Sequence, residues 1–143
     1  MKNEVPVSKI MSTNLVNLNL DDSLYKAEEL FKKNQIRHLP VIKGKKLVGI
    51  LSYTDLLRLS YVDSIDDNLD ADNFVYDTLS VKQVMMGKPV FVSTDTSIRE
   101  VSKILSEREF HALPVVDQHK NLVGIITTTD LIKYYHSLLY EQE

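Results

Sequence analysis

The sequence of 143 residues contains no cysteine and no tryptophan, and it has only four glycines and four prolines. Without cysteine, the chain can form neither disulfide bonds nor a thiolate zinc site, and it has no cysteine nucleophile. No run approaches the roughly 20 apolar residues of a membrane-spanning helix, and the N-terminal segment lacks the apolar core of a signal peptide. We therefore expect a cytoplasmic protein that does not enter a membrane.

Basic residues are missing from one stretch of the chain. Residues 60–80 contain six aspartates and no lysine or arginine, although the net charge of the whole chain is only −3. Because a run of like charges is usually solvated, we interpret residues 63–80 as an acidic linker. The run lacks the residue spacing of a calcium-binding loop, but magnesium binding there stays open as an alternative. Four apolar residues near its end are expected to dock locally: Phe74, Val75, Tyr76 and Leu79.

An internal repeat is the strongest signal in the sequence. The segment Val7–Leu59 recurs as Val81–Tyr134, at an offset of 74 residues that becomes 75 after a single insertion. Two of the four glycines and two of the four prolines are matched pairs, which makes chance a poor explanation. We therefore divide the chain into a first copy at residues 5–62, the acidic linker, and a second copy at residues 81–143.

Each copy is predicted to fold as strand, helix, strand, strand, helix. In the first copy, a strand is expected at residues 15–18, and a helix is expected to be capped by the side chains of Asp21, Asp22 and Ser23. A hairpin follows, and then a last helix that starts at Thr54. In the second copy, Ser97 stands in capping-box spacing with an acidic residue, and the last helix is expected to start at Thr129. A copy of this size covers only one face of a small sheet. The fold class is therefore α/β (α+β), with two βαββα repeats that pack sheet to sheet as a pseudo-twofold pair and share a core.

The most informative segment is Gly49-Ile-Leu-Ser-Tyr-Thr-Asp55, which recurs as Gly124-Ile-Ile-Thr-Thr-Thr-Asp130. In both copies a strand runs into the start of a helix that carries hydroxyl groups and a carboxylate. An aspartate can accept hydrogen bonds from both hydroxyls of a ribose, and hydroxyls and free N–H groups at a helix start can bind a phosphate. The same residues are also ordinary helix caps, so both interpretations stay open at this point.

Three patterns together resemble the CBS domain family, named after cystathionine beta-synthase. They are V-x-x-[IV]-M at the start of each copy, then Leu-Pro-Val, then Gly-h-h-[ST]-x-[ST]-Asp with apolar h, and the resemblance runs from about Val5 to Tyr135. It implies paired repeats, known as a Bateman module, that commonly form homodimers. It also implies binding of AMP, ADP or ATP in the clefts between the repeats, which regulates an attached or partner protein.

The resemblance also implies roles for particular residues. Asp55 and Asp130 match the aspartate that binds the ribose. The phosphates are expected near three basic residues and four hydroxyls: Arg37, His38, His111, Ser52, Thr54, Thr127 and Thr129. The adenine is expected among eight apolar residues: Leu15, Val16, Leu39, Val41, Pro89, Val90, Leu113 and Val115. Since the second copy has no arginine in this place, the site that receives Arg37 is expected to be the stronger one.

The function predicted from these patterns is a stand-alone regulatory pair that binds an adenine nucleotide, senses cellular energy and transmits its occupancy to an unknown partner protein. We do not expect an enzyme, a catalytic cofactor or a metal site, because the sequence has no P-loop, no glycine-rich dinucleotide motif and no nucleophile with an adjacent base. Nucleic-acid binding is not expected either, since there is no basic, aromatic-rich surface. Excess apolar residues on the last helix favour a homodimer. The alternatives are a ligand-free interaction module and a magnesium sensor.

Overall fold

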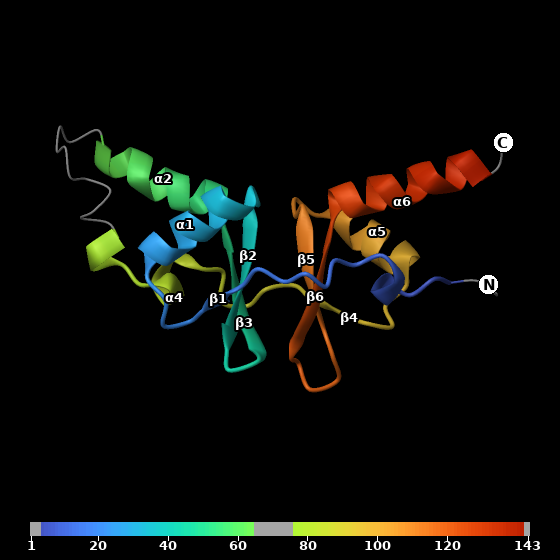
Figure 1. Ribbon diagram of the computed structural model, residues 1–143, viewed down its shortest axis with the longest axis horizontal. Helices are drawn as coiled ribbons and strands as arrows, with labels where there is room; N and C mark the ends of the chain where they lie inside the picture. The colour runs from blue at the N-terminus through green and yellow to red at the C-terminus, as the bar shows by residue number, and fades with distance from the viewer. Residues whose placement is uncertain (1–3, 65–75, 142–143) are drawn as a thin grey trace. The chain divides into compact units, whose positions relative to one another are not determined.

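A computed structural model describes residues 4–64 and 76–141, except for the side chains of residues 60–64. The described chain forms two three-stranded sheets in the orders β1-β2-β3 and β4-β5-β6, with helices packed against them (Figure 1). In each sheet the first two strands are parallel and the last two are antiparallel. The mixed α/β class predicted from the sequence is confirmed.

The chain divides into two compact units. The first is Val16–Pro89, and the second combines the N-terminal segment up to Leu15 with the chain from Val90 onward. The elements of the first unit are β1 (Leu18–Asn19), α1 (Leu24–Asn34), β2 (His38–Lys43), β3 (Lys46–Ser52), α2 (Tyr53–Ser64) and α4 (Val81–Val84). Those of the second unit are the 3₁₀ turn η1 (Val7–Lys9), β4 (Val92–Ser93), α5 (Ile98–Glu107), β5 (Ala112–Val116), β6 (Leu122–Thr127) and α6 (Thr128–Glu141).

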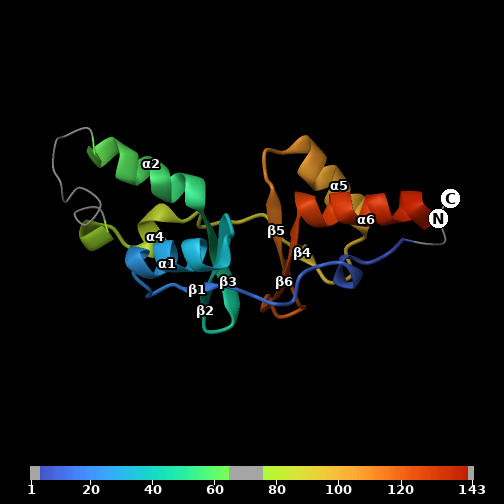
Figure 2. The same ribbon diagram turned by 45° about the horizontal axis from the view of Figure 1, so that its top comes forward.

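Helix α1 illustrates how the sequence sets these elements. Of the three residues expected to cap it, Ser23 is the N-cap, and its side chain accepts a hydrogen bond from the N–H of Lys26 at 3.1 Å. The helix buries Leu24, Ala27 and Phe31, spaced so that they share one face. That face closes the core of the first unit beside α2 and β2 (Figure 2).

The second unit repeats this construction. Helix α5 buries Ile98, Val101 and Leu105, and it packs beside α6. The side chain of Ser97 accepts a hydrogen bond from the N–H of Glu100 at 3.0 Å, so the predicted cap is present. The sheet of this unit is shielded by the same kind of apolar helix face as in the first unit.

Two predicted boundaries are wrong. The strand expected at residues 15–18 is instead Leu18–Asn19, because the chain passes from one unit to the other between Leu15 and Val16. The last helices begin at Tyr53 and Thr128, one residue earlier than expected. The predicted caps Thr54 and Thr129 already lie inside these helices, so their hydroxyls do not precede the first turn.

The capping hydroxyls belong to residues two positions earlier. Ser52 accepts a hydrogen bond from the N–H of Asp55 at 3.0 Å, and Thr127 accepts one from the N–H of Asp130 at 3.1 Å. An N-cap side chain reaches the N–H three residues further along, which these two residues do and Thr54 and Thr129 cannot do at this helix start. The motif hydroxyl at the strand end therefore starts the helix.

The core of each unit takes a residue from the other sequence copy. Val7, from the first copy, is buried with β4, β5 and β6, whereas Val81, from the second copy, is buried with β1, β2 and β3. The compact units therefore cut across the two copies. Tyr76 and Leu79, at the end of the linker, join the core of the first unit as expected, whereas Phe74 and Val75 lie outside the described residues.

This exchange is fixed at the edge strand of each sheet. Ser12 pairs with Ile125 of β6 through hydrogen bonds of 2.9 and 3.0 Å, and Met11 packs over Gly124. A Cβ atom added to Gly124 would lie 2.5 Å from the Sδ of Met11, so a larger residue there would force the Met11 side chain to shift. The first unit repeats the arrangement with Met85 over Gly49 and Met86 paired with Ile50.

Candidate functional site

In the first unit, the candidate ligand-binding residues meet where β2 begins and β3 ends. His38 of β2 is paired with Ser52 of β3. The carbonyl of Arg37 accepts a hydrogen bond from the N–H of Tyr53 at 2.8 Å, which holds the start of α2 against this strand end. Arg37, His38, Ser52 and Asp55 are therefore brought to one corner of the sheet, although their roles in binding stay a prediction.

Asp55 lies in the first turn of α2 with its side chain 51% exposed. Its backbone N–H is held by Ser52, whereas its carboxylate oxygen Oδ1 lies 3.6 Å from Nη1 of Arg58. An exposed ion pair of this kind contributes only about 0–1 kcal/mol to stability. A ligand that hydrogen-bonds to the carboxylate can therefore displace the guanidinium at little cost.

The second unit builds the same corner with a different hydrogen-bond pattern. Ala112 is paired with Thr127, and the carbonyl of His111 accepts a hydrogen bond from the N–H of Thr128 at 3.0 Å. Here the N–H of Thr127 also donates to Oδ2 of Asp130 at 2.9 Å. One carboxylate oxygen of Asp130 is therefore already occupied, so the two corners are chemically unequal.

The remaining candidates divide into exposed and buried groups. Thr54, Thr129, Arg37 and His111 are exposed. Four of the apolar candidates, Leu39, Val41, Leu113 and Val115, belong to the hydrophobic cores of their units, and Val16 and Val90 pack against those cores. Leu15 and Pro89 are partly buried where the chain passes between the units. Packing in the hydrophobic cores explains why the four buried residues are apolar. Contact of the eight apolar candidates with an adenine stays a prediction.

The sequence reasoning did not identify a hollow beside Asp55. It has a volume of about 330 Å³ and lies between α2 and the segment that contains α4. A signal for one of its residues was present in the repeat, because Arg58 follows Asp55 by three positions and Lys133 follows Asp130 by three. The lining residues are Asp55, Arg58, Leu59, Leu79, Gln83 and Val84.

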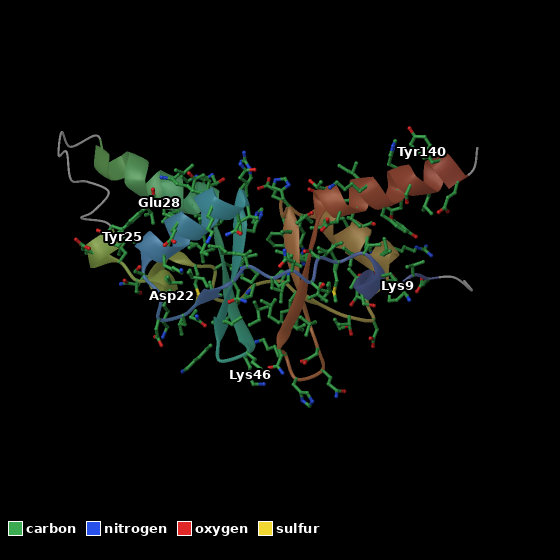
Figure 3. The ribbon with its side chains drawn as sticks, in the orientation of Figure 1. Lys9, Asp22, Tyr25, Glu28, Lys46 and Tyr140 are labelled. Atoms are coloured by element: carbon green, nitrogen blue, oxygen red, sulfur yellow. The ribbon has the colours of Figure 1, made fainter. Side chains whose placement is uncertain are left out.

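Tyr25 and Glu28 lie on α1 (Figure 3), and Tyr25 contacts the chain segment that precedes α4. The hydroxyl of Tyr25 donates to Oδ1 of Asp77 at 2.9 Å, and the rings of Tyr25 and Tyr76 pack edge to face with centroids 5.1 Å apart. Desolvation and the carboxylate of Asp77 raise the pKa of Tyr25. Desolvation also favours a raised pKa for Glu28, but hydrogen bonds from Lys32 and Tyr76 outweigh it and lower that pKa.

Within residues 4–64 and 76–141, no group of three or more histidine, aspartate or glutamate side chains is arranged to hold a metal ion. Most of the acidic linker on which the magnesium alternative depends lies outside the described residues. No helix in the described part of the chain is long and apolar enough to cross a membrane.

Comparison with known proteins decides the family. The model of the CBS domain matches residues 7–61 and again residues 81–137. The chain belongs to the CBS domain family. Since both copies match, it is a tandem CBS pair, or Bateman module, and the resemblance seen in its motifs is confirmed.

Relatives of this CBS pair include the uncharacterized protein MJ0188 of Methanocaldococcus jannaschii. The two are 32% identical over 129 residues, which is 90% of this chain but only 43% of that protein. A crystal structure of CBSX2 from Arabidopsis thaliana matches with a TM-score of 0.82 and 26% identity, covering 99% of each chain. A structure of CBSX2 in complex with AMP matches with a TM-score of 0.78 and 28% identity, covering 93% of this chain and 97% of that one.

Proposed function

We propose that this CBS pair is a regulatory, non-catalytic module that binds an adenosine ligand of the AMP, ADP or ATP type. The observation that carries the proposal is the half-exposed carboxylate of Asp55, which lies in the first turn of α2 and forms a weak ion pair with Arg58. A carboxylate in this state has the acceptor atoms that the two hydroxyls of a ribose require. The basic Arg37 and His38 lie at the same corner, where they favour an anionic ligand.

Similarity to CBSX2 supports this choice of ligand. That protein has been crystallised in complex with AMP. The two share 28% identity, and the match covers 93% of the present chain. The motif that ends in Asp55 recurs at Asp130, so each unit contains one aspartate of the kind expected to bind a ribose. AMP is therefore the first ligand to test.

The two aspartates are proposed to bind with different strength. Both oxygens of Asp55 are open to a ligand once Arg58 moves, whereas Oδ2 of Asp130 accepts a hydrogen bond from the N–H of Thr127. A ribose that engages Asp130 with both hydroxyls must share or replace that bond. We therefore place the tighter site at Asp55, in the copy that also contains Arg37.

The test is isothermal titration calorimetry of the purified chain with AMP, ADP, ATP and S-adenosylmethionine, using the variants Asp55→Asn and Asp130→Asn. Asparagine keeps the size of the side chain but removes the charge and one acceptor oxygen. A charge-assisted hydrogen bond is worth about 1.5–3 kcal/mol, so Asp55→Asn should weaken the tighter site roughly 10- to 100-fold. Circular dichroism and the melting temperature of each variant verify that its fold is intact.

Two outcomes would contradict the proposal. One is that the wild-type chain binds none of the four ligands. The other is that Asp55→Asn and Asp130→Asn both bind the ligand as tightly as the wild type does. The first outcome would favour a ligand-free interaction module. The second would keep an adenosine ligand and move it away from the motif aspartates.

An interaction module is the second candidate, and exposed apolar side chains on α6 favour it. Ile132, Leu139 and Tyr140 are 67%, 64% and 64% exposed, and Tyr140 lies near the C-terminal end of the helix (Figure 3). Their spacing places them along one side of the helix. We propose that this side of α6 pairs with a second copy of the chain in a homodimer. That assembly would transmit ligand occupancy to a regulated protein, which is how the module would sense cellular energy.

Analytical ultracentrifugation tests the homodimer. The wild type is expected to sediment as a dimer, and a double variant with Ile132→Ser and Leu139→Ser as a monomer, because a homodimer interface depends on its buried apolar core. Leu57→Ser on α2, an exposed leucine outside the proposed interface, is the matched control. A wild-type monomer at micromolar concentration would contradict the dimer. The cytoplasmic location stays a prediction.

A further inference from the structure

The hollow beside Asp55 combines an apolar wall with groups of both charges. Leu59, Leu79 and Val84 supply the wall, and Asp55 and Arg58 lie at its polar side. Its volume of about 330 Å³ lies at the lower end of the range in which small molecules are bound. The hollow is therefore chemically suited to a ligand that carries charge.

Arg58 is available to such a ligand. Its side chain is 76% exposed, and it forms an ion pair of 3.6 Å with Asp55 on the same helix. An exposed pair at this distance contributes little to stability, so it breaks readily when each partner is offered a better one. A phosphate offers the guanidinium a bidentate partner, and ribose hydroxyls offer the carboxylate two donors. A phosphorylated nucleoside supplies both at once.

Gln83 adds a second donor to the hollow. Its side-chain oxygen accepts a hydrogen bond from the N–H of Ser80 at 2.8 Å, as part of the capping box that starts α4. This bond fixes the amide group, whereas its nitrogen donates no hydrogen bond within the described part of the chain. A fixed amide loses little conformational freedom when it binds an anion.

We propose that Arg58 and Gln83 form the phosphate-binding part of the ligand site at Asp55, and that they let this unit discriminate AMP from adenosine. The proposal rests on the proposed function, because Asp55 must hold the ribose. It assigns the phosphate to the cation that lines the hollow, and not to Arg37, which does not line it. The discrimination comes from charge, since adenosine offers Arg58 nothing to bind.

The second unit provides a matched comparison. Lys133 follows Asp130 at the spacing by which Arg58 follows Asp55, but no ion pair joins it to Asp130 in the described structure. Lysine also lacks the planar fork that binds a phosphate through two parallel hydrogen bonds. Lys133→Gln therefore removes the same charge from the same helical position without touching the hollow.

The experiment is isothermal titration calorimetry with AMP and with adenosine on the wild type and on Arg58→Gln, Gln83→Glu and Lys133→Gln. Arg58→Gln is expected to weaken AMP binding at least about tenfold and to leave adenosine binding unchanged. Gln83→Glu keeps a residue that completes the capping box, but it adds a negative charge to the hollow. It should therefore also weaken AMP and spare adenosine, whereas Lys133→Gln should change neither.

Any other result contradicts the assignment of the phosphate to Arg58 and Gln83. If Arg58→Gln weakens AMP and adenosine equally, or neither, the phosphate does not lie at Arg58. If Arg37→Gln removes the preference for AMP while Arg58→Gln keeps it, the phosphate lies at the corner of β2 and β3. These results leave the proposed function standing, since AMP still binds. If the wild-type chain binds neither ligand, the proposed function fails together with the phosphate assignment.

Discussion

Alanine in place of Gly124 or Gly49 tests the exchange of N-terminal segments between the two sequence copies. At Gly124 the added Cβ would lie 2.5 Å from Sδ of Met11 and 3.0 Å from its Cγ, and these atoms belong to a flexible side chain. At Gly49 it would lie 2.3 Å from Sδ of Met85 and also 2.9 Å from the backbone oxygen of Met86. That oxygen cannot move freely, because it accepts a hydrogen bond from the N–H of Ile50 at 3.1 Å.

These contacts set the expected cost. Overpacking a well-filled site costs about 1–3 kcal/mol, and a methionine that can change its rotamer places Gly124→Ala at the lower end. The backbone contact places Gly49→Ala at the upper end. Since neither glycine has a positive φ, alanine also restricts the unfolded chain, which returns about 0.4–1 kcal/mol in both variants. The difference between the two variants should therefore be about 1–2 kcal/mol.

Chemical denaturation of the single variants and of the double variant Met11→Ala with Gly124→Ala measures these terms. Truncating Met11 removes the atoms that the new methyl group meets, so the double variant should be no less stable than Met11→Ala alone. The coupling free energy between the two sites should be about 1 kcal/mol. Additive effects would show that the methionine of the first copy does not pack on the glycine of the second, and the exchange would be refuted. Equal costs for Gly49→Ala and Gly124→Ala would refute the role given to the backbone oxygen.

Three further predictions concern the elements that carry the candidate site. Phe31→Ala should lower the free energy of unfolding by about 3–5 kcal/mol in urea denaturation, because Phe31 is fully packed in the core of the first unit beside the ring of Tyr53; a cost below 1 kcal/mol would contradict this packing. Ser23→Ala should cost about 1 kcal/mol through the lost cap of α1, and Ser23→Asp should restore most of it. Hydrogen bonds from the N–H groups of Asn121 and His119 hold the pKa of Asp117 below its usual value. These bonds therefore stabilise the folded protein above the unfolded pKa of about 4, and this stabilisation is lost as the pH falls through the folded pKa. Thermal melts between pH 2 and 6 should therefore show a smaller loss of stability with acid for Asp117→Ala than for the wild type, and parallel curves would contradict it.

The repeat made much of the fold predictable. The apolar spacing of Leu24, Ala27, Leu30 and Phe31 predicts one buried face of α1, where Leu30 is partly buried and the other three are buried. Ser23 and Ser97 cap the starts of two helices. These signals are local, since a helix face and an N-cap depend on residues within one or two turns. Local signals also misplaced the last helices by one residue, because the motif offers several hydroxyls in a row and only backbone geometry selects Ser52 and Thr127 as the caps.

The candidate site was predictable only in part. The sequence placed Ser52 and Asp55 in one motif, and the family resemblance added Arg37 and His38. The structure brings the four to one corner, because the hairpin of β2 and β3 returns the chain to that corner. The sequence did not locate Arg58 in a hollow, since that requires knowing that α2 and the segment containing α4 line the same space. Contacts between segments so far apart in the chain leave no spacing pattern that a single sequence reveals.

The sequence by itself determined that the chain has two related copies, which helix face each copy buries, and which chemical groups end the third strand of each copy. Tertiary structure alone decided that Met11 packs on Gly124 and Met85 on Gly49, so that each compact unit contains parts of both copies. It also decided that the carboxylate of Asp55 forms an ion pair with Arg58, whereas that of Asp130 accepts a hydrogen bond from the backbone N–H of Thr127. The physical reason is that the identity and spacing of the residues are properties of the sequence. The contact partner of a side chain depends instead on which distant segment of the chain packs beside it.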